Sequence, residues 1–258
     1  MEIYAIELTS RCNLRCHYCP QPSMQRAKED MPLEVFEKTL DYPFWKDVVA
    51  GHLFGEALLH PDLIDITRLC YERGLAFGFS TNAVLLEMDY LKKLIDAGLA
   101  WIMISFHIPR AKDWVEAIQK AFPKFPVLSS TLEIKHDWAG QVTSRRVVNY
   151  ANLGDCIFHT YNLVSISAQG EILPCCIDVE ARHSMGSLFD LSPEAFVAKE
   201  NKVWFDLCAQ CHMRDNPENL DALYAAYQGM GQKIHHYYNW KKDRDNSRDA
   251  MPRVSGSR

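Results

Sequence analysis

Residues 12–19 have the sequence CNLRCHYC, in which three cysteines are spaced C-x3-C-x2-C. This loop directly follows an apolar run at residues 3–8, which is typical of a buried β-strand. Three thiolates on one short loop suit three corners of an iron–sulfur cluster, because such clusters are held by cysteine thiolates. No fourth cysteine is near in the sequence, so one iron would keep an open position for another ligand. A zinc knuckle or three unrelated thiols are the alternatives, although zinc sites usually use two C-x2-C-like pairs.

The cysteine spacing, with the aromatic Tyr18 directly before Cys19, resembles the radical SAM superfamily. The resemblance implies that Cys12, Cys16 and Cys19 hold a 4Fe–4S cluster whose open iron binds the amino and carboxylate groups of S-adenosylmethionine (SAM). It also implies that Tyr18 lies at the SAM site. The likeness extends over residues 1–215 and is strongest at this loop and at a second group of cysteines near residue 175.

The composition is that of a globular chain with a hydrophobic core. Hydrophobic residues make up 48% of the 258 residues, and a net charge of −5 gives no basic surface for nucleic acid. We find no signal peptide and no apolar run long enough to span a membrane, so we expect a cytoplasmic protein without membrane contact. Nine cysteines in such a chain indicate metal binding or catalysis in a reducing compartment rather than disulfides. Cys70 stands apart from the other cysteines and is expected to be a core residue.

Short apolar runs alternate with helical patterns along the first half of the chain. Such alternation with short connections predicts a parallel α/β fold. Strands are expected at residues 3–8, 48–54, 75–79, 101–106 and 127–134, with a weak sixth unit at 142–151, and helices at 61–73, 88–97 and 111–122 and from about residue 32. About six units are too few for a closed eight-stranded barrel, and they fit the open partial βα barrel that radical SAM enzymes share. We therefore predict a partial barrel at residues 1–153, with ligands at the carboxyl ends of its strands.

Polar residues follow three of these strands, where a barrel gathers its ligands. Gly55-Glu56 partly resembles the Gly-Gly-Glu segment of the family, which implies a contact with the SAM ammonium, and the alternative is a plain turn. Ser80-Thr81-Asn82 resembles a segment near the SAM ribose and carboxylate, although these residue types also favour turns and helix caps. By the same resemblance, Ser80 and Asn82 contact SAM, and Ser105 contacts SAM or the substrate.

Other residues at the same ends of the strands are weaker candidates. His107 suits an acid or base, although a hydrogen-bonded loop histidine is the commoner case. Residues 136–140 (HDWAG) suit either a substrate contact or a surface loop anchored by Trp138. Arg145-Arg146 suits either an anionic group or a solvated face. We assign no catalytic residue from the sequence.

A second set of cysteines begins at Cys156. Apolar runs at residues 163–168 and 171–174 flank Gln169-Gly170 and predict a β-hairpin, and a helix is expected at 193–202. Four cysteines around this hairpin can ligate either a 4Fe–4S cluster or a structural zinc ion: Cys156, Cys175, Cys208 and Cys211. The arrangement resembles the SPASM, or twitch, domain that follows many radical SAM domains. The resemblance implies a second, auxiliary 4Fe–4S cluster in residues 154–215.

Cys176 is left over from this assignment, and we expect a core residue rather than a hydrogen-atom donor. The spacing of residues 220–238 predicts a C-terminal helix within 216–240. Residues 241–258 are rich in charged and small side chains, which is typical of a disordered tail.

Together, these resemblances imply an enzyme that reductively cleaves SAM to a 5′-deoxyadenosyl radical and abstracts a hydrogen atom from its substrate. An electron donor such as flavodoxin or ferredoxin would supply the electron. We expect oxidation of a small polar metabolite of the sugar or cyclitol type. The alternatives are a ribosomal-peptide maturase that epimerises or cross-links its substrate, and a non-catalytic metal-binding module.

Overall fold

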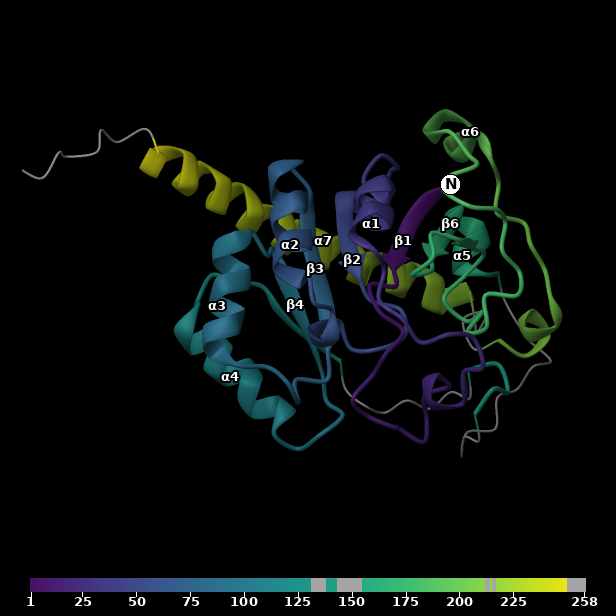
Figure 1. The fold of residues 1–258 in the computed structure, drawn as a ribbon, viewed down its shortest axis with the longest axis horizontal. Helices are drawn as coiled ribbons and strands as arrows, with labels where there is room; N and C mark the ends of the chain where they lie inside the picture. Colours follow the sequence, from purple (N-terminus) through teal and green to yellow (C-terminus); the bar gives the residue numbers. More distant parts are fainter. Residues whose placement is uncertain (131–137, 143–154, 212–213, 215–216, 250–258) are drawn as a thin grey trace, which may run out of the picture.

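The computed structural model describes residues 1–130, 138–142, 155–211, 214 and 217–249 (Figure 1). Within them, a four-stranded parallel sheet has the order β2 (Val48–Gly51), β3 (Ala76–Thr81), β4 (Trp101–Ser105), β5 (Val127–Ser130). Helices α2 (Leu63–Glu72), α3 (Met88–Ala97) and α4 (Ala111–Ala121) connect successive strands, and α1 (Leu33–Thr39) precedes β2. The predicted parallel α/β fold is confirmed.

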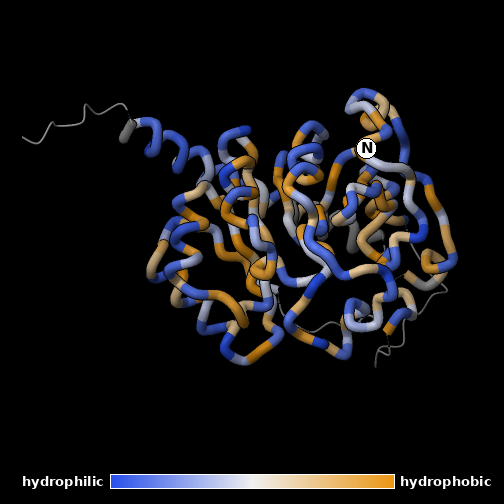
Figure 2. Tube along the Cα trace, in the orientation of Figure 1, coloured by the Kyte–Doolittle hydropathy of each residue, from blue (hydrophilic) through white to orange (hydrophobic). Residues whose placement is uncertain are grey.

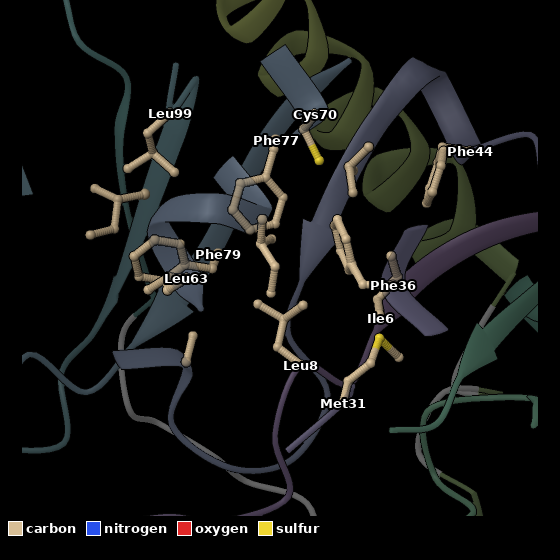
Figure 3. Packing of buried hydrophobic residues seen from close by; sticks show 14 of the residues in the cluster. Ile6, Leu8, Met31, Phe36, Phe44, Leu63, Cys70, Phe77, Phe79 and Leu99 are labelled. Atoms are coloured by element: carbon tan, nitrogen blue, oxygen red, sulfur yellow. The ribbon is translucent and has the colours of Figure 1, made fainter. Parts of the chain in front are cut away.

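One face of this sheet carries the main hydrophobic core. Phe77 and Phe79 of β3 and Leu63 of α2 are fully buried there, together with Phe36 of α1 (Figure 3). Cys70 lies in the same core, as expected from the sequence. Figure 2 shows hydrophobic residues along the central strands and hydrophilic ones on the outer turns of the helices. Alternate residues of a strand point to opposite faces, so the remaining strand residues need a second cover.

Helix α7 (Pro217–Asp249) provides that cover and runs behind the sheet in Figure 1. Its Ile234 and Tyr238 pack against Ala50, Ala76 and Trp101 on the face opposite α2 and α3. The sheet is therefore enclosed by helices on both faces.

A second sheet has the order β1 (Glu2–Ile6), β6 (Leu163–Ile166), β7 (Ile172–Leu173). Strands β6 and β7 form the predicted antiparallel hairpin, while β1 pairs with β6 in parallel. A single backbone bridge between Ile3 and Phe44 connects β1 to the segment before β2. The described strands thus form an open, unclosed arrangement, in agreement with the expected partial barrel. Short helices α5 (Ile157–Thr160) and α6 (Pro193–Ala198) flank the hairpin.

The C-terminal helix is longer than the sequence suggested. Residues 241–249, expected to belong to a disordered tail, continue α7 to Asp249. The Lys241 side chain is only 2% exposed and pairs with Asp245 at 2.6 Å, and Asp245 accepts a hydrogen bond from Tyr71 of α2 at 3.0 Å. Charged residues that looked like a solvated tail are therefore paired one helical turn apart and anchored to the body of the protein.

Several expectations fall outside the described residues. They are the end of the fifth strand after residue 130, the sixth unit beyond residue 142, Arg145-Arg146 and the last nine residues of the chain.

In the described part of the chain, no helix has the length and apolar character needed to cross a membrane.

Candidate active site

One cavity of about 240 Å³ lies at the carboxyl ends of β2, β3 and β4. Its wall contains every residue expected at the first cluster and at SAM: Cys12, Cys16, Tyr18, Cys19, Gly55, Glu56, Ser80, Asn82 and Ser105. These residues come from four separate segments of the sequence. The fold therefore brings together in one space the side chains that the sequence assigned separately.

The three cysteines stand on one wall of this cavity as partly buried thiols. Burial raises the pKa of Cys12, and it raises the pKa of Cys19 to about 11. Metal binding here would have to release the thiol protons, since thiolates are the ligands. Among the described residues, no three cysteine, histidine or carboxylate side chains are already arranged to hold a metal. The donor set nevertheless fits an iron–sulfur cluster, because three soft sulfur donors face one cavity.

Gly55 fixes the position of the cysteine loop. Its φ is +90°, and a Cβ atom at this position would lie 2.2 Å from the Thr9 carbonyl oxygen and 2.7 Å from that of Arg11. The next residue, Glu56, donates its backbone N–H to the Arg11 carbonyl at 2.8 Å. The backbone of the cysteine loop thus lies directly against the turn after β2, and only glycine allows this approach.

The Glu56 carboxylate is 1% exposed and is bound by its own chain. It accepts hydrogen bonds from the Thr81 hydroxyl at 2.6 Å, the Asn82 N–H at 2.7 Å and the Leu58 N–H at 3.1 Å. Burial raises the pKa of Glu56 despite these donors. The carboxylate therefore joins the ends of β2 and β3. A carboxylate can accept roughly four hydrogen bonds, and Glu56 accepts three from its own chain. One acceptor position is left for the SAM ammonium, and this contact remains a prediction.

Asn82 connects the end of β3 to the cysteine loop. Its side-chain amide donates to Asn13 Oδ1 at 2.8 Å, and its own Oδ1 accepts the N–H of Val84 at 2.9 Å. On the neighbouring strands, the Ser130 hydroxyl donates to Ser105 Oγ at 3.3 Å. Polar groups at the strand ends therefore hold one another as well as facing the cavity.

Aromatic and imidazole rings line the cavity beside the cysteines. The Tyr18 hydroxyl lies 2.6 Å from Nδ1 of His107, and the two rings are stacked with centroids 5.7 Å apart. The same His107 nitrogen is 3.7 Å from the Cys16 sulfur. The Trp138 indole donates to the Tyr18 carbonyl at 2.9 Å, which places this member of the 136–140 segment over the cysteine loop. His107 is therefore a hydrogen-bonded loop histidine beside the first cysteine set.

A family model matches nearly half of the chain. Residues 6–129 match the family model described as the Radical SAM superfamily. These residues form a radical SAM domain.

Several curated proteins match part of this chain, including one from Pyrococcus furiosus and one from Rhodopseudomonas palustris. The chain is 36% identical over 120 residues to the tungsten-containing aldehyde ferredoxin oxidoreductase cofactor-modifying protein of Pyrococcus furiosus, which covers 45% of this chain and 33% of that protein. It is 36% identical over 103 residues to the PqqA peptide cyclase of Rhodopseudomonas palustris, which covers 39% of this chain and 27% of the cyclase. The matches thus span a third or less of these relatives' own length.

The fold is similar beyond the radical SAM domain. The crystal structure of BtrN in complex with AdoMet and 2-DOIA matches with a TM-score of 0.64 at 18% identity, over 78% of this chain and 83% of that one. The coverage includes more of the chain than residues 6–129, so part of the C-terminal region shares this architecture.

The second cysteine set surrounds a small cavity of about 20 Å³ outside the radical SAM domain. Cys156, Cys175, Cys208 and Cys211 all line it, and the Arg214 guanidinium donates to the Cys208 carbonyl beside it at 2.9 Å. Cys176 does not line the cavity and packs near Ile177 and Cys211. The four cysteines expected to act together thus line one cavity, and Cys176 packs beside Cys156, Cys175 and Cys211 without lining it.

A buried ion pair connects the radical SAM domain to this second region. Arg26 donates to both carboxylate oxygens of Glu7 at 2.9 and 2.6 Å, and Glu7 is fully buried. Arg26 also donates to the Val179 carbonyl at 2.6 Å, and Glu7 accepts the N–H of Ala168. One charge pair thus joins β1, the segment after the cysteine loop and the hairpin region.

Two residues that the sequence did not single out stand near the main cavity. His52 directly follows β2 and lines it, and burial lowers the pKa of His52 to about 4. The His52 ring meets Trp101 of β4 edge-on, with centroids 6.2 Å apart. One feature of the sequence could have pointed to His52, because it is the titratable residue within the apolar run 48–54.

Proposed function

We propose that this chain is a radical SAM enzyme that reductively cleaves SAM and uses the 5′-deoxyadenosyl radical to abstract a hydrogen atom from a substrate. The observation that carries the proposal is the single cavity lined by the three-cysteine loop and by the polar ends of β2, β3 and β4. Cys12, Cys16 and Cys19 would hold a 4Fe–4S cluster, which supplies the electron and an open iron for SAM.

The residues of the chain then position the two cofactors and keep water out. Gly55 and Glu56 hold the cysteine loop and the end of β3 at fixed distances, so the cluster and SAM would meet in one geometry. Ser80, Asn82 and Ser105 offer hydroxyl and amide groups to the polar parts of SAM. Tyr18 and Trp138 line the cavity with large rings, which would help to keep solvent away from a radical.

The second cysteine set would hold an auxiliary 4Fe–4S cluster. Cys156, Cys175, Cys208 and Cys211 supply four thiolates, which leaves no open iron for direct substrate coordination. A closed cluster of this kind serves as an acceptor for one electron from a substrate radical. A zinc ion in the same four-cysteine site is the alternative occupant.

For the substrate we infer a small polar metabolite of the sugar or cyclitol type, which the enzyme oxidises by two electrons. Hydrogen-atom abstraction by the 5′-deoxyadenosyl radical would remove one electron and one proton, and the substrate radical would then pass its second electron to the auxiliary cluster and lose its hydroxyl proton to solvent. In support, the chain has the architecture of BtrN over most of its length, and the BtrN structure contains AdoMet and 2-DOIA. An external donor such as flavodoxin or ferredoxin would reduce the first cluster.

A peptide substrate is the second candidate. It is favoured by the 36% identity to PqqA peptide cyclase over 103 residues of this chain. In that case the chain would modify a partner peptide, and an epimerisation would need a hydrogen donor such as a thiol.

The test is the formation of 5′-deoxyadenosine by anaerobically reconstituted protein given dithionite and SAM. We expect the wild-type protein to form it and Cys16→Ala to form none, because the variant lacks one cluster ligand. Cys70→Ala is the matched control, since Cys70 is buried in the core away from both cavities and should leave the reaction intact. Iron-loaded wild-type protein that forms no 5′-deoxyadenosine would contradict the proposal.

A further inference from the structure

A second cavity lies between the central sheet and α7 and is called here the inner cavity. It has a volume of about 40 Å³, and its wall contains His52, Trp101, Met103 of β4 and Met230 of α7. A water molecule needs roughly 10–15 Å³, so the inner cavity has room for a small chemical group. His52 lines both the inner cavity and the main cavity, so both cavities lie beside this side chain.

Two buried polar atoms in this wall have no hydrogen-bond partner among the described residues. They are Nδ1 of His52 and Nε1 of Trp101, and the Trp101 side chain is almost completely buried. Buried polar groups in proteins are nearly always hydrogen-bonded, so each such exception needs an explanation. One exception lies directly after β2 and the other in β4, and two exceptions in the wall of one cavity point to a group that binds there.

The backbone is arranged to place the indole here. Strand register sets Trp101 beside Gly78, and Gly78 beside Ala50 of β2. A Cβ atom on Gly78 would lie 2.3 Å from the indole, so glycine is what allows the ring to cross β3 toward His52. On the opposite side, a Cβ atom on Gly231 of α7 would meet nothing within 4 Å, although this residue is buried. Glycine at position 78 therefore admits the indole, and glycine at position 231 leaves open space on the side of α7.

We propose that His52 and Trp101 form a subsite that binds a hydroxyl group of the substrate at the inner end of the main cavity. This inference rests on the proposed function and narrows its substrate to a neutral, hydroxyl-bearing small molecule. The indole N–H only donates, so it requires an acceptor oxygen. A hydroxyl group meets both needs, because its oxygen accepts a hydrogen bond from the Trp101 indole and its O–H donates one to His52. An ammonium or alkyl group offers no acceptor to the indole.

The electrostatics agree with a neutral ligand. Burial lowers the pKa of His52 to about 4, so its ring is uncharged at neutral pH and one of its nitrogens accepts. The aromatic rings of Tyr4 and Trp101 pack nearly at right angles to the His52 ring, with centroids 6.3 and 6.2 Å away, so no charged side chain stacks on it from these two residues. Lys46 also lines the inner cavity, which makes a carboxylate the chemical rival to be tested.

The experiment follows the indole N–H resonance of Trp101 in ¹⁵N-tryptophan-labelled protein with oxidised clusters and SAM. The resonance is assigned by its loss in Trp101→Phe. Two probes are titrated, myo-inositol as a neutral polyol and acetate as a carboxylate. We expect myo-inositol to shift the resonance saturably and acetate to leave it unchanged.

Variants show whether the shift reports binding at this subsite. We expect His52→Phe, which keeps a ring but removes its nitrogens, to weaken myo-inositol binding about tenfold or more, because a buried donor loses its shared partner. Gly231→Leu keeps both polar groups, fills the inner cavity and should weaken binding as well. His236→Phe on the exposed side of α7 is the control and should bind as the wild type does.

Three results would overturn the subsite: a resonance unmoved by myo-inositol, as for a cavity holding water only, a shift caused by acetate alone, or wild-type affinity in both His52→Phe and Gly231→Leu. The failure of the proposed function is scored separately, by 5′-deoxyadenosine formation with dithionite and SAM in the absence of any probe. The two claims can therefore fail independently.

Discussion

Gly55 carries the closest contact in the candidate site, because its Cα faces two carbonyl oxygens of the cysteine loop. We predict that Gly55→Ala lowers the free energy of unfolding by about 1–3 kcal/mol or more, since the change adds both a strained positive φ and a clash with backbone. Urea denaturation of the purified variant measures this loss.

Gly186→Ala separates the two effects. Gly186 has a φ of +121°, yet a Cβ atom there would meet nothing within 4 Å, so this variant suffers backbone strain without a clash. We expect it to lose less stability than Gly55→Ala. Equal losses in the two variants would mean that the contact with Thr9 and Arg11 does not restrict the cysteine loop.

His52 should make stability depend on pH. The pKa of His52 is lowered from about 6.5 to about 4 by burial, so between these values the unfolded state binds more protons than the folded state. Stability is therefore fully present above pH 6.5 and is lost as the pH falls toward 4. Relative to His52→Phe, the wild type should lose about 2 kcal/mol between pH 7 and pH 5. Parallel unfolding free energies of the two proteins over this range would rule out a buried neutral His52.

At the scale of elements, the last turns of α7 depend on a buried lysine. Lys241→Met keeps the apolar stem but removes the ammonium that pairs with Asp245, and we predict a loss of about 1–3 kcal/mol in the free energy of unfolding. Amide hydrogen exchange should also accelerate across residues 241–249. Lys202→Met breaks a solvent-exposed pair with Glu200 and should leave the stability nearly unchanged. Unchanged exchange in Lys241→Met would show that Tyr71 and the apolar contacts hold the helix end by themselves.

Local patterns predicted most elements because each depends on neighbouring residues. The helix expected at residues 88–97 is α3 with the same bounds, and the strand expected at 101–106 is β4 one residue shorter. The parallel pairing of β1 with β6 was not predicted, since a register between segments some 160 residues apart leaves no local trace. Residues 241–249 were misread for a similar reason, because the partner Tyr71 lies on a different helix.

Part of the candidate site was predicted from the sequence, because closely spaced cysteines and polar residues directly after strands are typical of binding sites. The cysteines and the polar strand ends line their cavities as a group. His52 and Trp101 were missed because histidine and tryptophan in apolar runs are ordinarily core residues. Their significance comes from unpartnered atoms beside a cavity, which only the folded chain reveals.

At the scale of the whole molecule, the account requires two separate metal centres. Reconstituted wild-type protein should contain about eight irons per chain, and Cys175→Ala about four, because each 4Fe–4S site is lost as a unit. Cys176→Ala is the matched neighbour and should keep about eight, since Cys176 does not line the small cavity. Iron loss in Cys176→Ala with retention in Cys175→Ala would reverse the assignment, and bound zinc would remove the auxiliary cluster.

The central claim is that the first three cysteines hold a cluster to which SAM binds. Electron paramagnetic resonance of the dithionite-reduced protein, recorded with and without SAM, tests it most directly. We predict that SAM changes the spectrum of the wild-type protein, and that a variant with Cys12, Cys16 and Cys19 replaced by alanine keeps only a signal that SAM does not alter. A wild-type spectrum unaffected by SAM, or the same SAM-dependent change in the triple variant, would contradict the account.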